Sequence, residues 1–200
     1  MTRIGGDERK KQLVEVALRA FGKRGYEATT LDEVATASGV RKQSLLYHFE
    51  TKEELFHACV QELGARTARA LDDALTGPEE GFDRVERVIA ALFKLAREWP
   101  DFPGFIREAG RHSPDVVQQV ASALDPLRKR ALLFLERGME AGVFRRQDPV
   151  LLLFSIYTAV VGSLTEAGVL RAVAGREGGR EALERRQQEL VEFVRAALEP

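Results

Sequence analysis

The sequence predicts an all-α protein of nine or ten helices, and three observations support that prediction. Apolar residues recur at helical spacing through almost the whole chain of 200 residues. No stretch alternates apolar and polar residues for long, and no turn dipeptide joins two such runs, so strand signals are nearly absent. Proline and glycine divide the periodic stretches into segments of ordinary helix length. We expect the helices to form a small N-terminal part and a larger C-terminal part.

The composition is that of an ordinary globular protein, since 44% of the residues are hydrophobic and 30% are charged. Cys59 is the only cysteine, so an intrachain disulfide is excluded, and we interpret it as a buried helical thiol in a reducing setting. The N-terminal residues contain no apolar signal-peptide core. The longest charge-free run, residues 149–165, is shorter than the roughly 20 residues that a membrane span needs. We therefore expect a cytoplasmic protein with no membrane partner.

Near the N-terminus the sequence predicts a helix-turn-helix at about residues 30–49. A first helix precedes it, capped by Asp7 and ending near Gly25. Two short helices follow, at about 31–38 and 42–48, and Gly39 closes the first of them. Thr30 stands three residues before Glu33, the spacing of a capping box, and the same spacing recurs at Thr51 and Glu54, where a fourth helix begins. The first helix has its predicted inner stripe at Leu13, Val16, Ala17, Ala20 and Phe21.

The helix-turn-helix has an apolar inner face and a polar outer face. The inner face comprises Leu31, Val34, Val40, Leu45 and Phe49. The outer face comprises Arg41, Lys42, Gln43, Ser44, Tyr47 and His48, which donate well to phosphates and base edges. Residues 1–50 hold nine Lys and Arg against seven Asp and Glu, whereas the rest of the chain is net acidic. This weak asymmetry has the sign that DNA binding requires, and we interpret the second short helix as a recognition helix.

Beyond the helix-turn-helix, helices are predicted at about 52–75, 79–98 and 103–111, with breaks at Gly77-Pro78 and around Pro100 and Pro103. Another segment opens at Pro114 and ends at Gly142. Within it, Asp125-Pro126 either kinks a helix or starts a fresh one. The cap Asp148 followed by Pro149 predicts the start of the next helix, and the loop 175–179 separates that helix from a last one at about 181–198.

The helix that begins at Pro149 is apolar nearly all round, so it must be covered on more than one side. A second copy of the same helix is the simplest cover in a chain of this size. We therefore expect a homodimer through residues 149–171 and 181–198, and a monomer that packs these helices internally is the alternative.

These residues together resemble the tetracycline-repressor (TetR) family of bacterial regulators. The resemblance covers about residues 8–57, and its most diagnostic part is GVRKQSLLYHFETKEELF, residues 39–56. It implies a helix-turn-helix DNA-binding domain at residues 1–52 and a helical effector-binding and dimerisation domain at residues 53–200. It also implies double-stranded operator DNA as a partner.

The family's DNA contacts transfer residue by residue. Phosphate contacts fall on Thr29 or Thr30, Tyr47, His48 and Lys52, and base-edge contacts on Lys42, Gln43 and Ser44. Arg41 stands where the family often has a capping serine, and Leu46 where it often has a tyrosine. We interpret Arg41 as an added phosphate or base contact. Because of these two departures, the operator sequence does not transfer from relatives.

The larger part carries more aromatic residues than a thin helical domain needs, and three basic residues lie near its proline-broken region, 99–114. We expect a small lipophilic effector with an anionic end, such as a fatty acid or acyl-CoA. The predicted pocket residues are Phe93, Trp99, Phe102, Phe105, Arg107, Arg111, Phe134, Met139, Phe154 and Tyr157. Plain core packing is the alternative for each of them.

Other function classes receive less support. No nucleophile elbow, phosphate loop or carboxylate pair indicates an enzyme, and no catalytic residue or cofactor is predicted. His48 and His57 lie nine positions apart, which is not the spacing of a helical zinc pair, so no metal site is predicted. We expect a ligand-responsive repressor. A transcriptional activator, a small-molecule carrier or enzyme with a vestigial head, and a nonspecific DNA binder are the alternatives.

Overall fold

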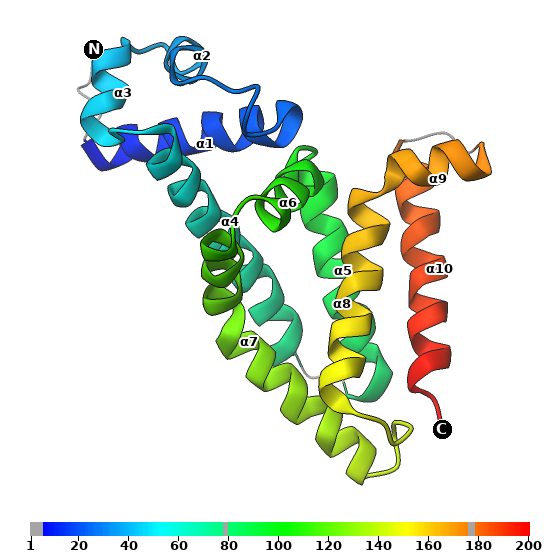
Figure 1. Cartoon of the computed structure of the whole chain (residues 1–200). Helices are drawn as coiled ribbons and strands as arrows, with labels where there is room; N and C mark the ends of the chain where they lie inside the picture. The colour runs from blue at the N-terminus through cyan, green and yellow to red at the C-terminus, as the bar shows by residue number, and fades with distance from the viewer. Residues whose placement is uncertain (1–5, 78–79, 176–178) are drawn as a thin grey trace. The chain divides into compact units, whose positions relative to one another are not determined.

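The computed structural model describes residues 6–77, 80–175 and 179–200, and within these ranges all regular structure is helical (Figure 1). The prediction of an all-α fold is therefore confirmed. The helices are α1 (Gly6–Arg24), α2 (Leu31–Ala37), α3 (Lys42–His48), α4 (Lys52–Thr76), α5 (Gly81–Glu98), α6 (Phe102–Arg111), α7 (Pro114–Glu140), α8 (Pro149–Thr165), α9 (Ala167–Ala174) and α10 (Arg180–Leu198).

The described residues form two compact units. One unit, which we call the head, holds residues 6–66 and 101–123, and the other, which we call the body, holds 67–77, 80–100, 124–175 and 179–200. The head therefore contains α6 and the first turns of α7 in addition to the helix-turn-helix. The division into domains at residues 52 and 53 stays a prediction, because compactness alone does not decide where a function ends.

The core of the head forms where α1, α4 and α6 bring aromatic rings together. The Phe56 ring lies edge-on to Phe21, with centroids 5.1 Å apart, and 5.4 Å from the Phe105 ring. Cys59 is fully buried beside them, as the sequence predicts. On α1 the buried residues are Leu13, Val14, Ala17, Leu18 and Phe21, so the prediction of Val16 and Ala20 is wrong. The buried stripe is rotated from the predicted one because α1 is covered by α6 as well as by α2.

α1 and α6 cross at backbone contact, and two glycines make this possible. A Cβ atom on Gly104 would lie 2.0 Å from the carbonyl oxygen of Gly22, and one on Gly22 would lie 2.5 Å from the carbonyl oxygen of Asp101. Neither distance is compatible with a side chain, because the opposing atoms belong to the backbone and cannot rotate away. The crossing is the most extensive helix–helix contact of the head.

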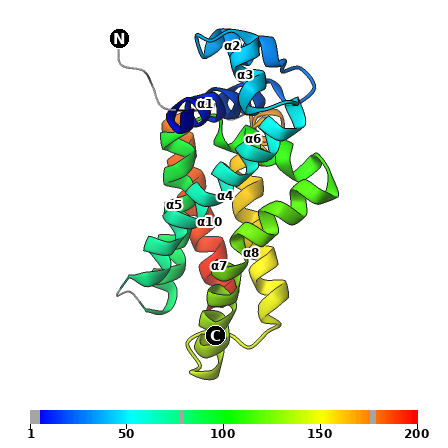
Figure 2. The ribbon, with the colours of Figure 1, turned by 90° about the vertical axis from the view of Figure 1, so that its left-hand side faces the viewer.

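In the body, α5, α8 and α10 pack against one another, and α8 and α10 lie side by side in both views (Figures 1 and 2). Their buried residues include Ile89, Phe93, Leu152, Val160 and Val194. The opposite side of α8 leaves large apolar side chains exposed, among them Leu151, Phe154 and Tyr157.

One predicted alternative is resolved, one predicted boundary differs, and some predicted breaks lie outside the described residues. α7 continues through Pro126, which resolves the alternatives left open there. α8 ends at Thr165 and α9 follows across a bend of 73°, so the predicted dimer segment 149–171 is two helices. The predicted breaks at Pro78 and at residues 176–178 lie outside the described residues. No single described helix could cross a membrane; only α8 taken together with Ala167–Val173 passes by length and composition.

Candidate nucleic-acid interface

The turn between α2 and α3 is built from local hydrogen bonds. The Thr30 hydroxyl accepts the N–H of Glu33 at 3.3 Å, and the Glu33 carboxylate accepts the N–H of Thr30 at 2.9 Å, so the predicted capping box is present. Gly39 adopts a φ of 67° and reverses the chain. The N–H of Val40 then donates to the carbonyl of Ala35 at 3.0 Å, which fixes α3 close across α2.

α3 presents one buried face and one exposed face, as predicted. Leu45 is fully buried and Phe49 nearly so, and these two side chains anchor the helix on the head. Lys42, Gln43 and Ser44 are exposed on the other side. Tyr47 is 86% exposed, which is extreme for an aromatic residue and leaves its hydroxyl free to meet a partner.

The two ends of α3 carry further polar groups. Arg41 is the N-cap residue and its side chain makes no capping hydrogen bond, so the exposed guanidinium is available for another contact. His48 is half-buried, and its ring lies edge-on to Tyr47 with centroids 5.2 Å apart. The two rings thus support each other at the C-terminal end of the helix.

Acidic residues of α2 hold two of the cations near this face. The Lys42 ammonium pairs with Asp32 at 2.6 Å, and Arg24 pairs with Glu33 at 2.6 Å. Hydrogen bonds from Arg24 and Thr30 lower the pKa of Glu33, so the carboxylate stays charged near neutral pH. The Lys42 ammonium therefore already has a carboxylate partner in this structure.

The two threonines before α2 differ in their exposure to solvent. Thr29 is fully buried, its hydroxyl donates to the carbonyl of Gly25 at 2.8 Å, and its N–H donates to the carbonyl of Tyr26 at 3.1 Å. Its assignment as a phosphate contact is corrected, because neither of its donors faces solvent. Thr30 is exposed and remains the candidate of the pair.

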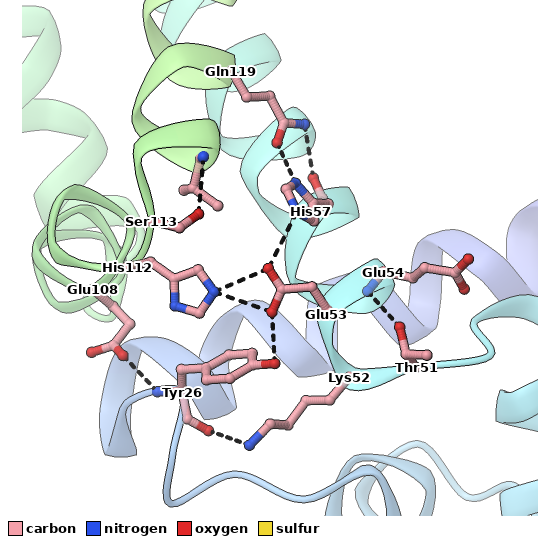
Figure 3. Close-up of polar contacts among 11 residues, drawn as sticks. Tyr26, Thr51, Lys52, Glu53, Glu54, His57, Glu108, His112, Ser113 and Gln119 are labelled. Carbon is pink, nitrogen blue, oxygen red and sulfur yellow. Dashed lines mark hydrogen bonds and ion pairs between the residues drawn. The ribbon is translucent and has the colours of Figure 1, made fainter.

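Lys52, at the start of α4, lies over Tyr26 (Figure 3). Its Nζ atom donates to the carbonyl oxygen of Tyr26 at 3.0 Å and lies 4.1 Å from the centroid of the Tyr26 ring. The Thr51 hydroxyl caps α4 by accepting the N–H of Glu54 at 3.1 Å. The first turn of α4 therefore combines a positioned cation with free backbone N–H groups, an arrangement that favours an anion.

A family model described as "Bacterial regulatory proteins, tetR family" matches residues 13–59, which span α1 to the first turns of α4. A curated relative, the uncharacterized HTH-type transcriptional regulator YhgD of Bacillus subtilis, is 26% identical over 162 residues, or 77% of this chain and 83% of YhgD. Residues 13–59 thus carry the N-terminal region of the TetR family. It is thus a DNA-binding transcriptional regulator with a helix-turn-helix.

Two solved structures share the fold of most of the chain. The transcriptional regulator FadR of Bacillus subtilis, solved in complex with stearoyl-CoA, superposes with a TM-score of 0.77 at 14% identity, over 94% of this chain and 98% of its own. AibR, solved with isovaleryl coenzyme A and operator DNA, also reaches 0.77, at 19% identity, over 93% of this chain and 97% of its own. At these identities the likeness concerns the fold alone.

One cation near this candidate interface was missed by reasoning from the sequence. The Nζ atom of Lys10, on the first turns of α1, lies 5.5 Å from the centroid of the Phe49 ring, just after the end of α3. Lys10 is exposed. The adjacent pair Lys10-Lys11 was the available signal, but only the fold brings α1 beside residues 48 and 49.

The ten predicted effector residues are divided between the two units. Phe102, Phe105, Arg107 and Arg111 lie in the head, and the other six lie in the body. Phe154 and Tyr157 are 60% and 53% exposed on α8, so their assignment to a pocket interior is corrected. Arg107 and Arg111 are exposed, whereas the remaining aromatic residues and Met139 are buried or half-buried.

A recess in the body is lined by polar residues that were not predicted. It has a volume of about 320 Å³ and is bordered by Arg97, Arg180, Glu184, Gln187 and Gln188. Hydrogen bonds link Arg97 to Gln187 and Arg180 to Glu184, so both guanidinium groups already have partners. Among the described residues no group of three or more His, Cys, Asp or Glu could hold a metal ion.

Proposed function

We propose that this regulator binds a pseudo-palindromic operator as a homodimer, represses transcription, and is released by a small lipophilic effector with an anionic end. The observation that carries the proposal is the two-sided α3, with Leu45 buried and Gln43, Ser44 and Tyr47 turned to solvent. Such a helix fits the major groove with its polar side facing the bases. Acting on operator DNA, the protein would work in the cytoplasm, and the proposed role is not enzymatic.

Within this proposal, Lys42, Gln43 and Ser44 read base edges. Gln suits adenine and Lys suits guanine in the major groove. Phosphates are contacted by Thr30, Tyr47, His48 and Lys52, with Arg41 and Lys10 as further cations at the two ends of the interface. These contacts set affinity and its dependence on salt, whereas the first group sets sequence preference.

Selection of bound DNA from a random pool, followed by fluorescence anisotropy with the selected duplex, tests this assignment. We expect Gln43→Ala to relax the preference at one base position by about 1–3 kcal/mol, or roughly 5- to 150-fold. Gln118→Ala, an exposed glutamine of α7, is the matched control and should leave binding unchanged. If Gln43→Ala keeps the full preference at every position, α3 is not the reading helix.

The proposed homodimer is supported by the exposed apolar surface of α8 and α10. Leu151, Phe154 and Phe193 are 64%, 60% and 64% exposed, and exposed apolar groups of this size typically mark an interface. Two-fold pairing through α8 and α10 would hide them and would present two recognition helices to half-sites about 34–36 Å apart.

Sedimentation over a range of protein concentrations tests the dimer. Phe154→Glu should shift the protein to monomer and weaken operator binding, because a buried charge at the interface has no partner. Gln118→Glu adds the same charge to an exposed position of α7, outside α8 and α10, as a control. A wild-type chain that sediments as a monomer at micromolar concentration would contradict the dimer proposal.

The effector proposal is supported by the aromatic residues of the body, which include Phe93, Trp99 and Phe134, and by the acyl-CoA ligands in the structures of FadR and AibR. A ligand at about 100 times its dissociation constant adds about 2.7 kcal/mol of stability. For a chain of this size that corresponds to a rise in Tm of roughly 5–11 °C. A panel of acyl-CoA esters and fatty acids in which none raises Tm or releases operator DNA would refute it.

The sign of regulation is tested separately with a reporter placed behind the selected operator. Repression predicts higher expression when the gene for the regulator is deleted. Lower expression on deletion would show that the same fold acts as an activator.

A further inference from the structure

Glu53 of α4 joins three parts of the head through a single carboxylate (Figure 3). It accepts the hydroxyl of Tyr26 at 2.8 Å. It also lies 3.1 and 3.2 Å, through its two oxygens, from Nε2 of His112, the residue that ends α6. Because a carboxylate has only acceptor atoms, Nε2 of His112 must carry the proton and donate it.

Tyr26 is held from a second side by α6. Its N–H donates to the Glu108 carboxylate at 2.9 Å, and its ring lies edge-on to His112 with centroids 4.4 Å apart. The side chain of His112 is only 14% exposed, whereas that of Glu53 is 45% exposed. α6 thus fixes both the backbone and the ring of Tyr26.

Tyr26 in turn is the platform for Lys52. The carbonyl oxygen of Tyr26 accepts one N–H of the Lys52 ammonium at 3.0 Å, and the ring face lies 4.1 Å from the nitrogen. An ammonium has three N–H groups, so donors remain for a phosphate. A lysine side chain is otherwise highly flexible, and holding it in place before DNA arrives removes part of the cost of ordering it on binding.

The pKa shifts of Tyr26 and Glu53 favour the hydrogen bond between them near neutral pH. Burial and the hydrogen bond to Glu53 raise the pKa of Tyr26, so its hydroxyl remains a donor. Burial raises the pKa of Glu53, but the hydrogen bonds from Tyr26 and His112 outweigh that effect and leave it below its ordinary value. Glu53 therefore remains an acceptor near neutral pH.

We propose that His112 is a positioning residue for DNA binding, which acts through Glu53 and Tyr26 to hold the Lys52 ammonium where it meets a DNA phosphate. The inference rests on the proposed function, because Lys52 is a phosphate contact only if the head binds DNA. It adds that the end of α6, 59 positions away from Glu53 in the chain, helps to determine the strength of that contact.

The test measures the dissociation constant for the selected operator as a function of salt in wild type, Lys52→Ala, His112→Ala and the double variant. Lys52→Ala should weaken binding to all sequences and lower the salt slope by about 1. His112→Ala should do the same in part, with a dissociation constant raised about 3- to 10-fold, as expected for a weakened charge-assisted hydrogen bond to phosphate. The double variant should bind no more weakly than Lys52→Ala, since both changes act on one contact.

Two further variants separate positioning from folding. His112→Gln keeps an N–H donor near Glu53 and should restore most of the wild-type affinity and salt slope. Tyr26→Phe removes only the hydroxyl and should reproduce the effect of His112→Ala without leaving a cavity. Gln118→Ala, an exposed residue of the same unit, is the control and should change nothing.

Each outcome decides one of the two proposals. If Lys52→Ala leaves affinity and salt slope unchanged, the proposed phosphate contact fails. If Lys52→Ala weakens binding but His112→Ala and Tyr26→Phe do not, the positioning role of His112 fails alone. If the loss caused by His112→Ala persists in full in the Lys52→Ala background, His112 acts through general stability and the inference is overturned.

Discussion

Replacing Gly104 with alanine tests the backbone contact on which the head depends. The added Cβ would lie 2.0 Å from the Gly22 carbonyl oxygen and 3.0 Å from its carbon. Both atoms belong to the backbone of α1, so no rotation of a side chain can relieve the clash. α1 and α6 must therefore move apart, and the rings of Phe21, Phe56 and Phe105 that lie between α1, α4 and α6 lose contact.

The size of the effect follows from two opposing contributions. Overpacking of a well-packed core costs about 1–3 kcal/mol, and a clash with backbone atoms belongs at the upper end of that range. Alanine returns up to about 1 kcal/mol through its better helix propensity. We expect a net loss of about 2 kcal/mol, which lowers Tm by roughly 4–8 °C in a chain of this size.

Thermal unfolding followed by circular dichroism provides the measurement, and α6 itself offers the control. A Cβ on Gly110 would meet no atom within 4 Å. Gly110→Ala should therefore raise Tm by about 2–4 °C, through helix propensity alone. The two glycine variants should thus differ in sign. Equal Tm values for Gly104→Ala and Gly110→Ala would refute the close crossing of α1 and α6.

Three other predictions concern the helix-turn-helix and its support. Thr30→Ala should lower the free energy of unfolding by about 1 kcal/mol, because it removes the capping box. Thr36→Ala within the same helix should lower it by less than half of that amount, and chemical denaturation measures both values. Leu45→Ala should lower the free energy of unfolding by about 2–5 kcal/mol, because the side chain is fully buried. Ser44→Ala beside it should leave the stability nearly unchanged while altering DNA binding. The pKa of Glu53 is held below its ordinary 4.5 in the folded state, so its contribution to stability is present above that pH and is lost as pH falls through the lower folded value. Urea unfolding from about pH 5 to pH 3 should therefore show a smaller loss of stability for Glu53→Gln than for wild type, and parallel curves would contradict the role given to the carboxylate.

The helix-turn-helix could be predicted from the sequence because its determinants are local. The capping box spans three residues, the reversal needs one glycine, and the two faces of α3 follow from helical periodicity over seven residues. The same periodicity places Lys42, Gln43 and Tyr47 on the exposed face of α3 once Leu45 and Phe49 are assigned to its buried face. The burial of Thr29 could not be predicted in this way, because it depends on how the loop after Gly25 folds back on itself.

The packing of α6 in the head could not be predicted, because no local sequence pattern indicates which helices it contacts. Gly22 and Gly104 are ordinary glycines in the sequence, and only the fold shows that their backbones touch. The hydrogen bond from Tyr26 to Glu108 joins residues 82 positions apart. Composition and periodicity describe each helix separately, so they predict the helix at about 103–111 but assign its residues to an effector pocket in the larger part and not to the head.

This placement of α6 changes how an effector could influence DNA binding. Phe105 is fully buried against Phe56 in the head, so its atoms already have partners there, and a ligand could reach them only by displacing part of that core. An effector that shifts α6 must therefore overcome the contacts of this helix with Gly22, Tyr26 and Glu53. It lowers DNA affinity only to the extent that it binds more tightly when those contacts are broken. Variants that weaken them, such as His112→Ala, should consequently bind the effector more tightly while binding DNA less tightly, and effector titrations of both proteins can measure this reciprocity.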